Sequence, residues 1–558
     1  MSPIVDPIRA EVVARHFLAT SEEMGATLLR TAFSPNIKER ADCSTAIFDA
    51  RGQLVALAQR VPVHLGSMVG IVEAFRARYP LGETQPGDMF AANDPYSGGG
   101  SHLPDITVIA PVFVGEHVVA YVANIAHHAD VGGMLPGSEA AVCKTIFQEG
   151  LRVPLVQIMH AGKANRDVLD LIALNSRTPQ ERLGDLQAQF AANVVGIRGV
   201  TALFERYGEA ETGAHMAAYL DFTEKRFRAA IDQLPPGTYV DEDALDGDDE
   251  GSTVTIRLSL TVGDGRLHFD FTGSGRQLNC ARNIPYRALL ATLYTVTKSM
   301  LDPEVPANAG YYRTLTLHAP AGTVVCPESP AAVGARSISC GVLGDVIAGC
   351  LSQAIPEKTL ARSGPHHLLV LSGTDPRTRK YFVDYETVAG GMGARTQRDG
   401  MDAVRVHASG ASNLPVEALE HAYPLVVERY ALREDSGGDG TYRGGLGVVR
   451  DYRILGDDIQ VSLSSERQHV AAQGTCGGMP GATGEFVVNP DRPDERKLPS
   501  AAADISLPRD SVLSIRTPAG GGFGEAEYRD RQLIERDVRE GRISAEHAGR
   551  IYRWHKEK

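Results

Sequence analysis

The segment from Gly87 to Gly133 most constrains the fold of this chain, because it combines two apolar runs with a dense set of metal-binding side chains. The runs Ile106–Val114 and Val118–Ile125 are typical of buried strands, and residues 115–116 form a short turn between them. The side chains of metal-binding type are Asp94, His102, Asp105, His127, His128 and Asp130. A hairpin brings the start of its first strand and the end of its second strand together, so we expect the two histidine-containing groups to meet there.

Imidazole and carboxylate groups that converge from strand ends suit Zn²⁺, Mn²⁺ or Fe²⁺. The glycine-rich loop Ser97–Gly100 precedes His102, and a Gly-Gly pair at 132–133 follows Asp130, which allows close approach of the backbone. A lone histidine is nevertheless more often structural than a ligand, and no spacing here is as diagnostic as paired CxxC motifs. From the residues alone, a metal site and a set of structural histidines both remain open.

Composition excludes several classes of function. The net charge is −13 and there is no long basic run, which argues against nucleic acid as the main partner. The seven cysteines are scattered, odd in number and free of CxxC motifs, which is typical of a reduced, cytoplasmic protein. We expect no signal peptide, because the N-terminus lacks a basic and an apolar region, and no membrane span, because no apolar run of about 18 residues occurs.

The length of 558 residues exceeds what one simple core accommodates, and 58 glycines favour a loop-rich fold that contains strands. We predict an α+β fold with several lobes, in which mixed and antiparallel sheets pack against helical layers. The predicted regions are an N-terminal α/β region with the metal site at 1–160, a helical layer at 161–236, a glycine-rich α+β region at 237–525 and a helical C-terminal tail at 526–558.

Local patterns predict the elements that surround the metal-binding segment. Residues 6–31 have apolar residues at helical spacing and begin with an Asp-Pro pair, which is typical of a helix start. The runs Cys43–Phe48 and Gln53–Ala58 are predicted to pair as a hairpin, with Asp42 at its entry. The segment His64–Ala77 is predicted to form one helix.

Familiar nucleotide and hydrolase motifs are missing: there is no P-loop, no GxGxxG after a strand, no GxSxG and no HExxH. Two glycine-rich loops need an explanation. AGGMGARTQRDG, residues 389–400, either surrounds an anionic group or makes a tight corner. The loop Ser436–Gly447 looks like a phosphate cradle, but we favour a structural turn, because a glycine-rich loop alone is weak evidence.

Several long motifs occur together and in a characteristic order. They are SPNIKERADCSTAIFD, GDMFAANDPYSGGGSHLPDITVIAPVF, AHHADVGG, GGMGARTQRDG, DSGGDGTYRGGLG and PAGGGFG. On these motifs the chain closely resembles the hydantoinase B / oxoprolinase family, from about Asp6 to Gly524. That family includes B subunits of ATP-dependent hydantoinases and lactamases, the C-terminal half of 5-oxoprolinases, and subunits of acetone and acetophenone carboxylases.

The resemblance implies an ATP-dependent amidohydrolase subunit that opens a hydantoin, 5-oxoproline or lactam ring. In such systems a separate A subunit of actin-like fold binds ATP and phosphorylates the substrate, and the B subunit handles the activated species at a metal centre. A hetero-oligomer such as A2B2 is implied. One alternative is a subunit of an ATP-dependent ketone carboxylase, and another is a non-catalytic scaffold for the ATPase subunit.

The resemblance also implies a metal-ligand set, matched motif by motif: Asp42, His102, Asn124 and His127. Asparagine is a weak, neutral ligand, so His128 or Asp130 is an alternative ligand that completes the set. Glu39, Asp105 and Asp130 are candidates for base or other catalytic roles. Glu39 and Asp105 also have ordinary explanations, as a surface ion pair and a turn cap respectively.

Overall fold

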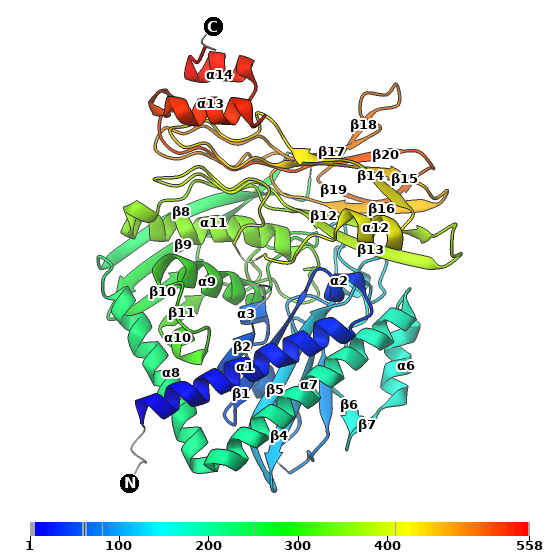
Figure 1. Cartoon of the computed structure of the whole chain (residues 1–558), viewed down its shortest axis with the longest axis vertical. Helices are drawn as coiled ribbons and strands as arrows, with labels where there is room; N and C mark the ends of the chain where they lie inside the picture. Colours follow the sequence, from blue (N-terminus) through cyan, green and yellow to red (C-terminus); the bar gives the residue numbers. More distant parts are fainter. Residues whose placement is uncertain are drawn as a thin grey trace.

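The chain has an α+β architecture, as predicted, in a computed structural model (Figure 1). The residues that the structure describes are 6–58, 61, 64–80, 82–249, 251–407 and 409–555. Within them, four sheets contain seven, four, four and five strands.

The first sheet carries the predicted hairpin at its centre. All of its neighbouring strands are antiparallel, in the order β2-β1-β5-β4-β3-β6-β7. Its strands are β1 (Cys43–Asp49), β2 (Leu54–Ala58), β3 (Met89–Ala92), β4 (Asp105–Val114), β5 (His117–His127), β6 (Val156–His160) and β7 (Lys163–Ala164). The strands β4 and β5 pair with Asp105 opposite His127, so the predicted meeting of the two strand ends is confirmed.

One face of this sheet is covered by long helices (Figure 1). They are α1 (Pro7–Thr31) and α7 (Pro179–Tyr207), which are flanked by α6 (Arg166–Asn175) and α8 (Glu209–Ile231), with the short helix α2 (Pro35–Lys38) beside α1. The predicted start of α1 is confirmed, since the Asp6 side chain accepts a hydrogen bond from the Ile8 N–H and proline stands in the first turn. Apolar residues of α1, α7 and the sheet form one buried cluster.

The predicted helix 64–77 is interrupted. It consists of α3 (His64–Ser67) and α4 (Ile71–Arg78), which are separated at Gly70. Gly70 has φ +80°, a left-handed conformation that ends one helix turn and precedes the next. The hydrophobic pattern is continuous across this glycine, and for this reason it did not reveal the break. The interruption leaves His64 in a separate short turn beside the ends of β4 and β5.

A second sheet has the order β11-β10-β9-β8 and is mixed, because β10 and β11 are parallel. Its strands are β8 (Gly237–Asp246), β9 (Thr253–Gly263), β10 (Arg266–Asp270) and β11 (Leu315–His318). The helices near it are α9 (Tyr286–Leu301), α10 (Ala309–Tyr312), α11 (Arg336–Ala354) and the 3-10 turn η1 (Pro356–Lys358). Among the described residues, only α11 has the length and apolar composition of a membrane-crossing helix, and 83% of its apolar window is buried within the protein.

Two further sheets pack against each other above α11 (Figure 1). The first has the order β13-β12-β16-β19 and the second β14-β15-β20-β17-β18. Their strands are β12 (His367–Thr374), β13 (Tyr381–Val388), β14 (Leu425–Leu432), β15 (Val448–Ile454), β16 (Ile459–Ser464), β17 (Glu485–Val488), β18 (Arg496–Leu498), β19 (Ala501–Leu507) and β20 (Val512–Arg516). The short helices α5 (Ile146–Glu149) and α12 (Val416–Ala422) lie in connecting segments.

Glycine-rich segments form a layer beside these sheets in which backbones touch directly. A Cβ added at Gly391 would lie 2.0 Å from the Gly445 carbonyl oxygen, and one at Gly444 would lie 1.9 Å from that of Gly520. The loop Ser436–Gly447 therefore serves packing, as the favoured interpretation predicts. The C-terminal elements η2 (Ala526–Tyr528), α13 (Arg531–Arg539) and α14 (Ala545–Tyr552) lie on this layer (Figure 1).

Candidate metal centre

Three predicted side chains meet in the interior of the protein. His102, Asp105 and His127 each offer a ligand atom, and these atoms lie within 4.8 Å of one another. All three residues are buried. Asp105 begins β4 and His127 ends β5 directly opposite it, while the turn before β4 supplies His102. The hairpin thus positions the cluster through strand register.

His102 lies between two carboxylates. Its Nε2 is 3.2 Å from Asp105 Oδ2, and its Nδ1 is 2.6 Å from Glu139 Oε1. Neither ring nitrogen makes a hydrogen bond to any described residue, in spite of these short separations. Donor atoms that approach one another without pointing at one another are expected where they share a metal ion, since its ligands stand about 2.0–2.2 Å from a common centre.

Asp105 is fixed through one oxygen and free through the other. Its Oδ2 accepts hydrogen bonds from Ser101 Oγ at 3.1 Å and from Arg336 Nη2 at 3.1 Å. Its buried Oδ1 has no hydrogen-bond partner among the described residues. Burial opposes ionisation of Asp105, but His102, His64 and Arg336 hold its pKa well below the usual range. An ionised, unpartnered oxygen is therefore available to a cation.

These observations fit a divalent transition metal. Two imidazoles and one carboxylate form a three-ligand set, which resembles catalytic sites that leave a position for water or substrate. The donor types suit Zn²⁺, Mn²⁺ or Fe²⁺. The orphaned atoms of His102 and Asp105 are the structural evidence for this fit.

Neighbouring groups hold the His127 ring in place. Asn36 Nδ2 lies 2.8 Å from His127 Nδ1 and also donates to the His127 carbonyl oxygen at 2.8 Å. The ring stacks on Tyr385 with a centroid separation of 4.6 Å. Partners of this kind orient a ligating histidine and raise its effectiveness.

Glu139 joins the site although the sequence analysis did not identify it. Its Oε1 is 3.4 Å from His127 Nε2 as well as 2.6 Å from His102 Nδ1. Burial opposes its ionisation, but the two histidines lower its pKa below the usual value. Glu139 belongs to the irregular segment that follows the hairpin. Its place within the mostly apolar run GSEAAV was the one sequence feature that could have indicated a buried, functional glutamate.

Arg336 was also missed and supplies the positive charge of the site. It begins α11, and its guanidinium contacts Asp105 Oδ2 at 3.1 Å and Glu139 Oε1 at 3.2 Å. It also lies 2.8 Å from Ser101 Oγ. The sequence separation from Asp105 is 231 residues, so no local pattern connects the two.

Asp42 lies at the edge of the cluster and not within its closest part. The backbone N–H of His127 donates to the Asp42 carbonyl oxygen at 3.0 Å, because β1 pairs with β5. The Asp42 carboxylate is 3.8 Å from His64 Nε2, which is itself 3.8 Å from Asp105 Oδ1. His64, which the sequence analysis did not select, thus links Asp42 to the three central residues.

The structure does not bring Asn124 and His128 into the cluster. Successive strand residues point to opposite faces, so Asn124, three positions before His127, faces α7. Its amide donates to the Gln189 carbonyl oxygen at 2.9 Å and to Asn193 Oδ1 at 2.8 Å. His128 Nε2 lies 3.0 Å from Gln189 Oε1 on the same side, and burial lowers its pKa.

Asp130 and Glu39 also lie elsewhere. Asp130 is buried and pairs with Arg177 at 3.0 Å, and it accepts hydrogen bonds from the Gly137 and Arg177 backbone N–H groups. It thereby fixes the loop after β5. Glu39 is exposed at the end of α2, and Asp94 forms an ion pair with Arg152 at 2.6 Å.

A small cavity of ≈ 40 Å³ opens beside the cluster. Asp42, His64, Asp105 and His127 are among the residues that line it. Tyr385, His366, Arg336 and Arg405 are among the residues on the remaining sides. Burial lowers the pKa of His366, so this ring is neutral at physiological pH. The cavity therefore combines metal-type ligands, cationic groups and aromatic surface.

Comparison with known proteins agrees with this architecture. A putative D-/L-hydantoinase B subunit of Pseudomonas sp. is 31% identical over 98% of this chain and 94% of its own length. An uncharacterized protein of Methanocaldococcus jannaschii is 36% identical over 98% of this chain and 96% of its own length. The 5-oxoprolinase of Dictyostelium discoideum is 32% identical over 94% of this chain, which spans only 41% of that longer protein.

Two solved structures share the fold. The ATP-dependent caprolactamase from Pseudomonas jessenii superimposes with a TM-score of 0.90 at 27% identity, over 98% of this chain and 96% of that one. An acetone carboxylase structure has a TM-score of 0.88 at 20% identity, over 98% of this chain and 79% of that one, which establishes a common fold. The family model described as Hydantoinase B/oxoprolinase matches residues 6–526, and the chain belongs to this family.

Proposed function

We propose that this chain is the metal-dependent B component of an ATP-dependent amidohydrolase that opens a small cyclic amide. Hydantoin, 5-oxoproline and lactam rings are the candidate substrates. The observation that carries the proposal is the buried convergence of His102, Asp105 and His127 beside a cavity. The full-length similarity to a hydantoinase component and to a caprolactamase supports the amide class.

The three central residues would hold the metal, with Asp42 and Glu139 near enough to adjust its charge. Such an ion, when bound, polarises a carbonyl or lowers the pKa of a bound water. The protein side chains supply orientation and charge balance. Arg336 offsets one of the two negative charges of Asp105 and Glu139, Asn36 orients the His127 ring, and burial excludes bulk water.

Arg405 is suited to bind an anionic oxygen of the activated substrate. It lines the cavity, donates to the Thr387 carbonyl oxygen at 3.0 Å and has an Nε without a hydrogen-bond partner among the described residues. Burial lowers its pKa to about 10, so it stays cationic at neutral pH. A phosphorylated amide carries its negative charge on oxygens that a guanidinium binds in bidentate fashion.

ATP would be bound by a separate A-type ATPase subunit, in keeping with the absence of a P-loop and of a GxGxxG after a strand in this sequence. The Pseudomonas hydantoinase relative is named as one subunit of its enzyme, which indicates that it works with another. We assign the same arrangement to this chain, as a hetero-oligomer such as A2B2. At 20% identity, the similarity to acetone carboxylase shows a common fold and nothing about the substrate. We therefore prefer the amide class of substrate to the ketone class.

The test is to co-purify the chain with an A-type ATPase subunit and to offer hydantoin, 5-oxoproline, caprolactam, and acetone with bicarbonate. The expected result is ATP-dependent ring opening, measured as the ring-opened acid, that falls by at least ~10²-fold in His102→Ala. His117→Ala is the matched control, since His117 is an exposed histidine on the same hairpin. Full activity of His102→Ala would support the scaffold alternative, and carboxylation without ring opening would support the carboxylase alternative.

A further inference from the structure

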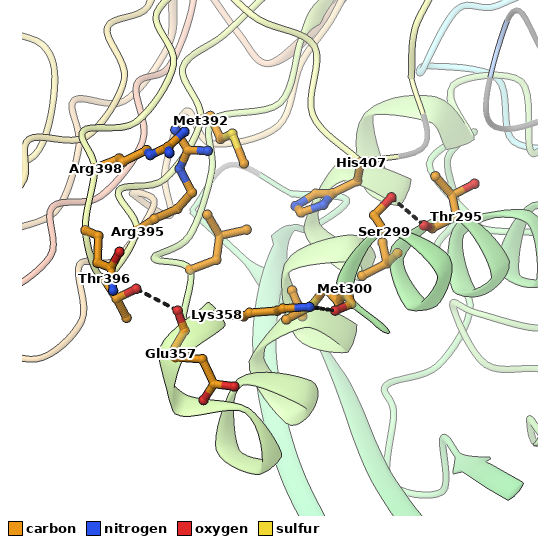
Figure 2. Close-up of a pocket in the computed structure, with 14 residues that line it drawn as sticks. Thr295, Ser299, Met300, Glu357, Lys358, Met392, Arg395, Thr396, Arg398 and His407 are labelled. Carbon is orange, nitrogen blue, oxygen red and sulfur yellow. Dashed lines mark hydrogen bonds between the residues drawn. The ribbon is translucent and has the colours of Figure 1, made fainter. Parts of the chain in front are cut away.

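A second and larger cavity lies away from the metal centre. It has a volume of ≈ 430 Å³ and lies between α9, the C-terminal half of α11 and the glycine-rich loop 389–400. In Figure 2, Arg395 and Arg398 form one wall, His407 and Ser299 stand opposite, and Lys358 lies between them. The size matches pockets that bind small organic ligands.

This cavity is separate from the candidate metal centre. Arg336 at the metal centre and Ala348 at the cavity both belong to α11, where Arg336 is the first residue. At 1.5 Å per helical residue, they are separated by about 18 Å along the axis. No residue of the central histidine and aspartate cluster lines the larger cavity.

Three cations at the cavity have no carboxylate partner among the described residues. Lys358 Nζ donates to the Met300 carbonyl oxygen at 2.6 Å, and Arg395 Nη2 donates to the Asp399 carbonyl oxygen at 3.2 Å. Arg395 Nε has no hydrogen-bond partner within the described ranges. Arg398 has no carboxylate within ion-pair distance among the described residues. Lys358 and Arg398 are exposed and Arg395 is half-buried, and the exposed Glu357 also lines the cavity without an ion pair to them among the described residues. The positive charge of the two arginines therefore faces a cavity and is available to an anion.

The contrast with other arginines in this half of the chain is clear. Arg443 pairs with Asp402 at 3.0 Å and with Asp537 at 3.3 Å. Arg529 pairs with Asp399 at 2.7 Å and also with Asp537 at 2.6 Å. These arginines have acids built into the fold, whereas Lys358, Arg395 and Arg398 do not, so the charge at the cavity is left for a ligand.

The loop geometry presents the two arginines together. Arg395 and Arg398 form an isolated antiparallel bridge, with Arg395 N donating to Arg398 O at 3.0 Å and Arg398 N to Arg395 O at 3.4 Å. Residues opposite each other in such a bridge direct their side chains to one face. A Cβ at Gly393 would lie 1.8 Å from the Ala361 carbonyl oxygen, so the loop backbone that carries the two arginines is closely packed.

The remaining lining gives the cavity an apolar part. Val296 and Met300 of α9, Ala348 of α11 and Leu360 line it beside the cations. Val296 and Ala348 are buried. An inorganic anion alone would leave this surface in contact with water, so the lining suits an anion that carries an apolar body.

We propose that this cavity binds a small organic anion, with its carboxylate or phosphate group held by Arg395 and Arg398 and its apolar body against Val296 and Met300. Guanidinium groups bind both anion types in bidentate geometry. The proposal goes beyond the amidohydrolase function, because it requires neither the metal centre nor the partner subunit. It would give the glycine-rich loop 389–400 an anion-binding role in addition to the tight corner that its backbone contacts make.

The experiment is isothermal titration calorimetry on the purified chain with four probes: phenyl phosphate, benzoate, inorganic phosphate and benzyl alcohol. We expect phenyl phosphate or benzoate to bind with a Kd below about 1 mM, and the tighter of the two identifies the anionic group. Inorganic phosphate should bind at least ~10-fold more weakly than phenyl phosphate, and benzyl alcohol should give no measurable heat.

Substitutions of the two arginines test whether the anion binds in this cavity. Arg395→Gln and Arg398→Gln should each weaken the anionic probe by at least ~10-fold, because each removes a charge-assisted contact. Arg198→Gln is the charge-matched control, since Arg198 is exposed on α7 far from this loop in sequence. Thermal unfolding of each variant establishes that it is folded.

The proposal is overturned if neither anionic probe binds at about 10 mM, or if both cavity variants bind as the wild type does. Equal binding of benzyl alcohol would also overturn it, because the charge would then have no role. Metal content measured on the same variants should remain at the wild-type value. Failure of the anion site is thus distinguishable from failure of the proposed metal function.

Discussion

Asp105 and His127 face each other across the β4–β5 hairpin, as the first and last residues of strands that are paired in register. This pairing places a carboxylate and an imidazole together without any help from distant loops. The turn before β4 places His102 beside these two residues. Two of the three central side chains are therefore positioned by paired backbone.

Substitution of Glu139 tests whether the carboxylate that the sequence analysis missed supports metal binding. Glu139→Gln removes a negative charge next to His102 and His127, and Arg336 loses one of its partners. We expect metal affinity to fall by roughly 10–100-fold, measured by competition with a chelator. Glu116→Gln in the exposed hairpin turn is the control, and an equal loss in both variants would contradict the assignment.

Substitution of Asn124 tests whether this residue has a structural role or binds the metal. Its amide is satisfied by Gln189 and Asn193 on the face opposite His127. We expect Asn124→Ala to lose about 1–3 kcal/mol of unfolding free energy, because it leaves buried partners unpaired. Metal content should stay at the wild-type value, and a metal-free but stable Asn124→Ala protein would instead make Asn124 a ligand.

The glycine layer predicts a pair of opposite stability effects. Gly393→Ala places a Cβ 1.8 Å from the Ala361 carbonyl oxygen, so the backbone must shift, and we expect a loss of about 1–3 kcal/mol or more. Gly213→Ala in α8 meets no atom within 4 Å and should stabilise by up to about 1 kcal/mol. Denaturant unfolding measures both free energies. A Gly393→Ala protein that is more stable than the Gly213→Ala protein would refute this packing.

The C-terminal helices should be attached more firmly at acidic than at alkaline pH. The hydrogen bond from His547 Nε2 to Asp439 Oδ1, at 2.8 Å, raises the pKa of His547, and Asp435 lies 3.9 Å away while Arg550 opposes the effect. A raised pKa in the folded state stabilises fully below the unfolded value of about 6.5 and is lost as pH rises through the folded value.

We therefore expect protease to release the segment of α13 and α14 faster at pH 8.5 than at pH 6. His547→Gln should abolish most of this difference, because the neutral side chain does not titrate. The same pH dependence in wild type and variant would show that other groups control the attachment.

The sequence predicts the core of the candidate site because its signals are local. The apolar runs around residues 115–116 predict the hairpin, and the histidines at its ends follow from chain order. Strand alternation also argues against one predicted ligand. Asn124 and His127 differ by an odd number of positions and so point to opposite faces of the sheet, although the family resemblance implied that both bind the metal. The structure places them accordingly.

The remaining parts of the site depend on tertiary packing. Arg336 reaches Asp105 across 231 residues, and Glu139 lies in a segment without regular periodicity. The acidic stretch around Asp241 lies largely in β8, where Arg362 pairs with Asp241 at 2.8 Å. Such long-range charge pairs have no signature in a single sequence, because the partners are defined only after the sheets and helices assemble.

The most direct test of the central claim is elemental analysis of purified wild type, His102→Ala, His127→Ala and the control His117→Ala. We expect about one equivalent of Zn, Mn or Fe in wild type and in His117→Ala, and loss of the metal in the other two variants. A wild-type protein that contains no metal, and takes up none when Zn²⁺ or Mn²⁺ is supplied, would contradict the metal centre and make the histidines structural.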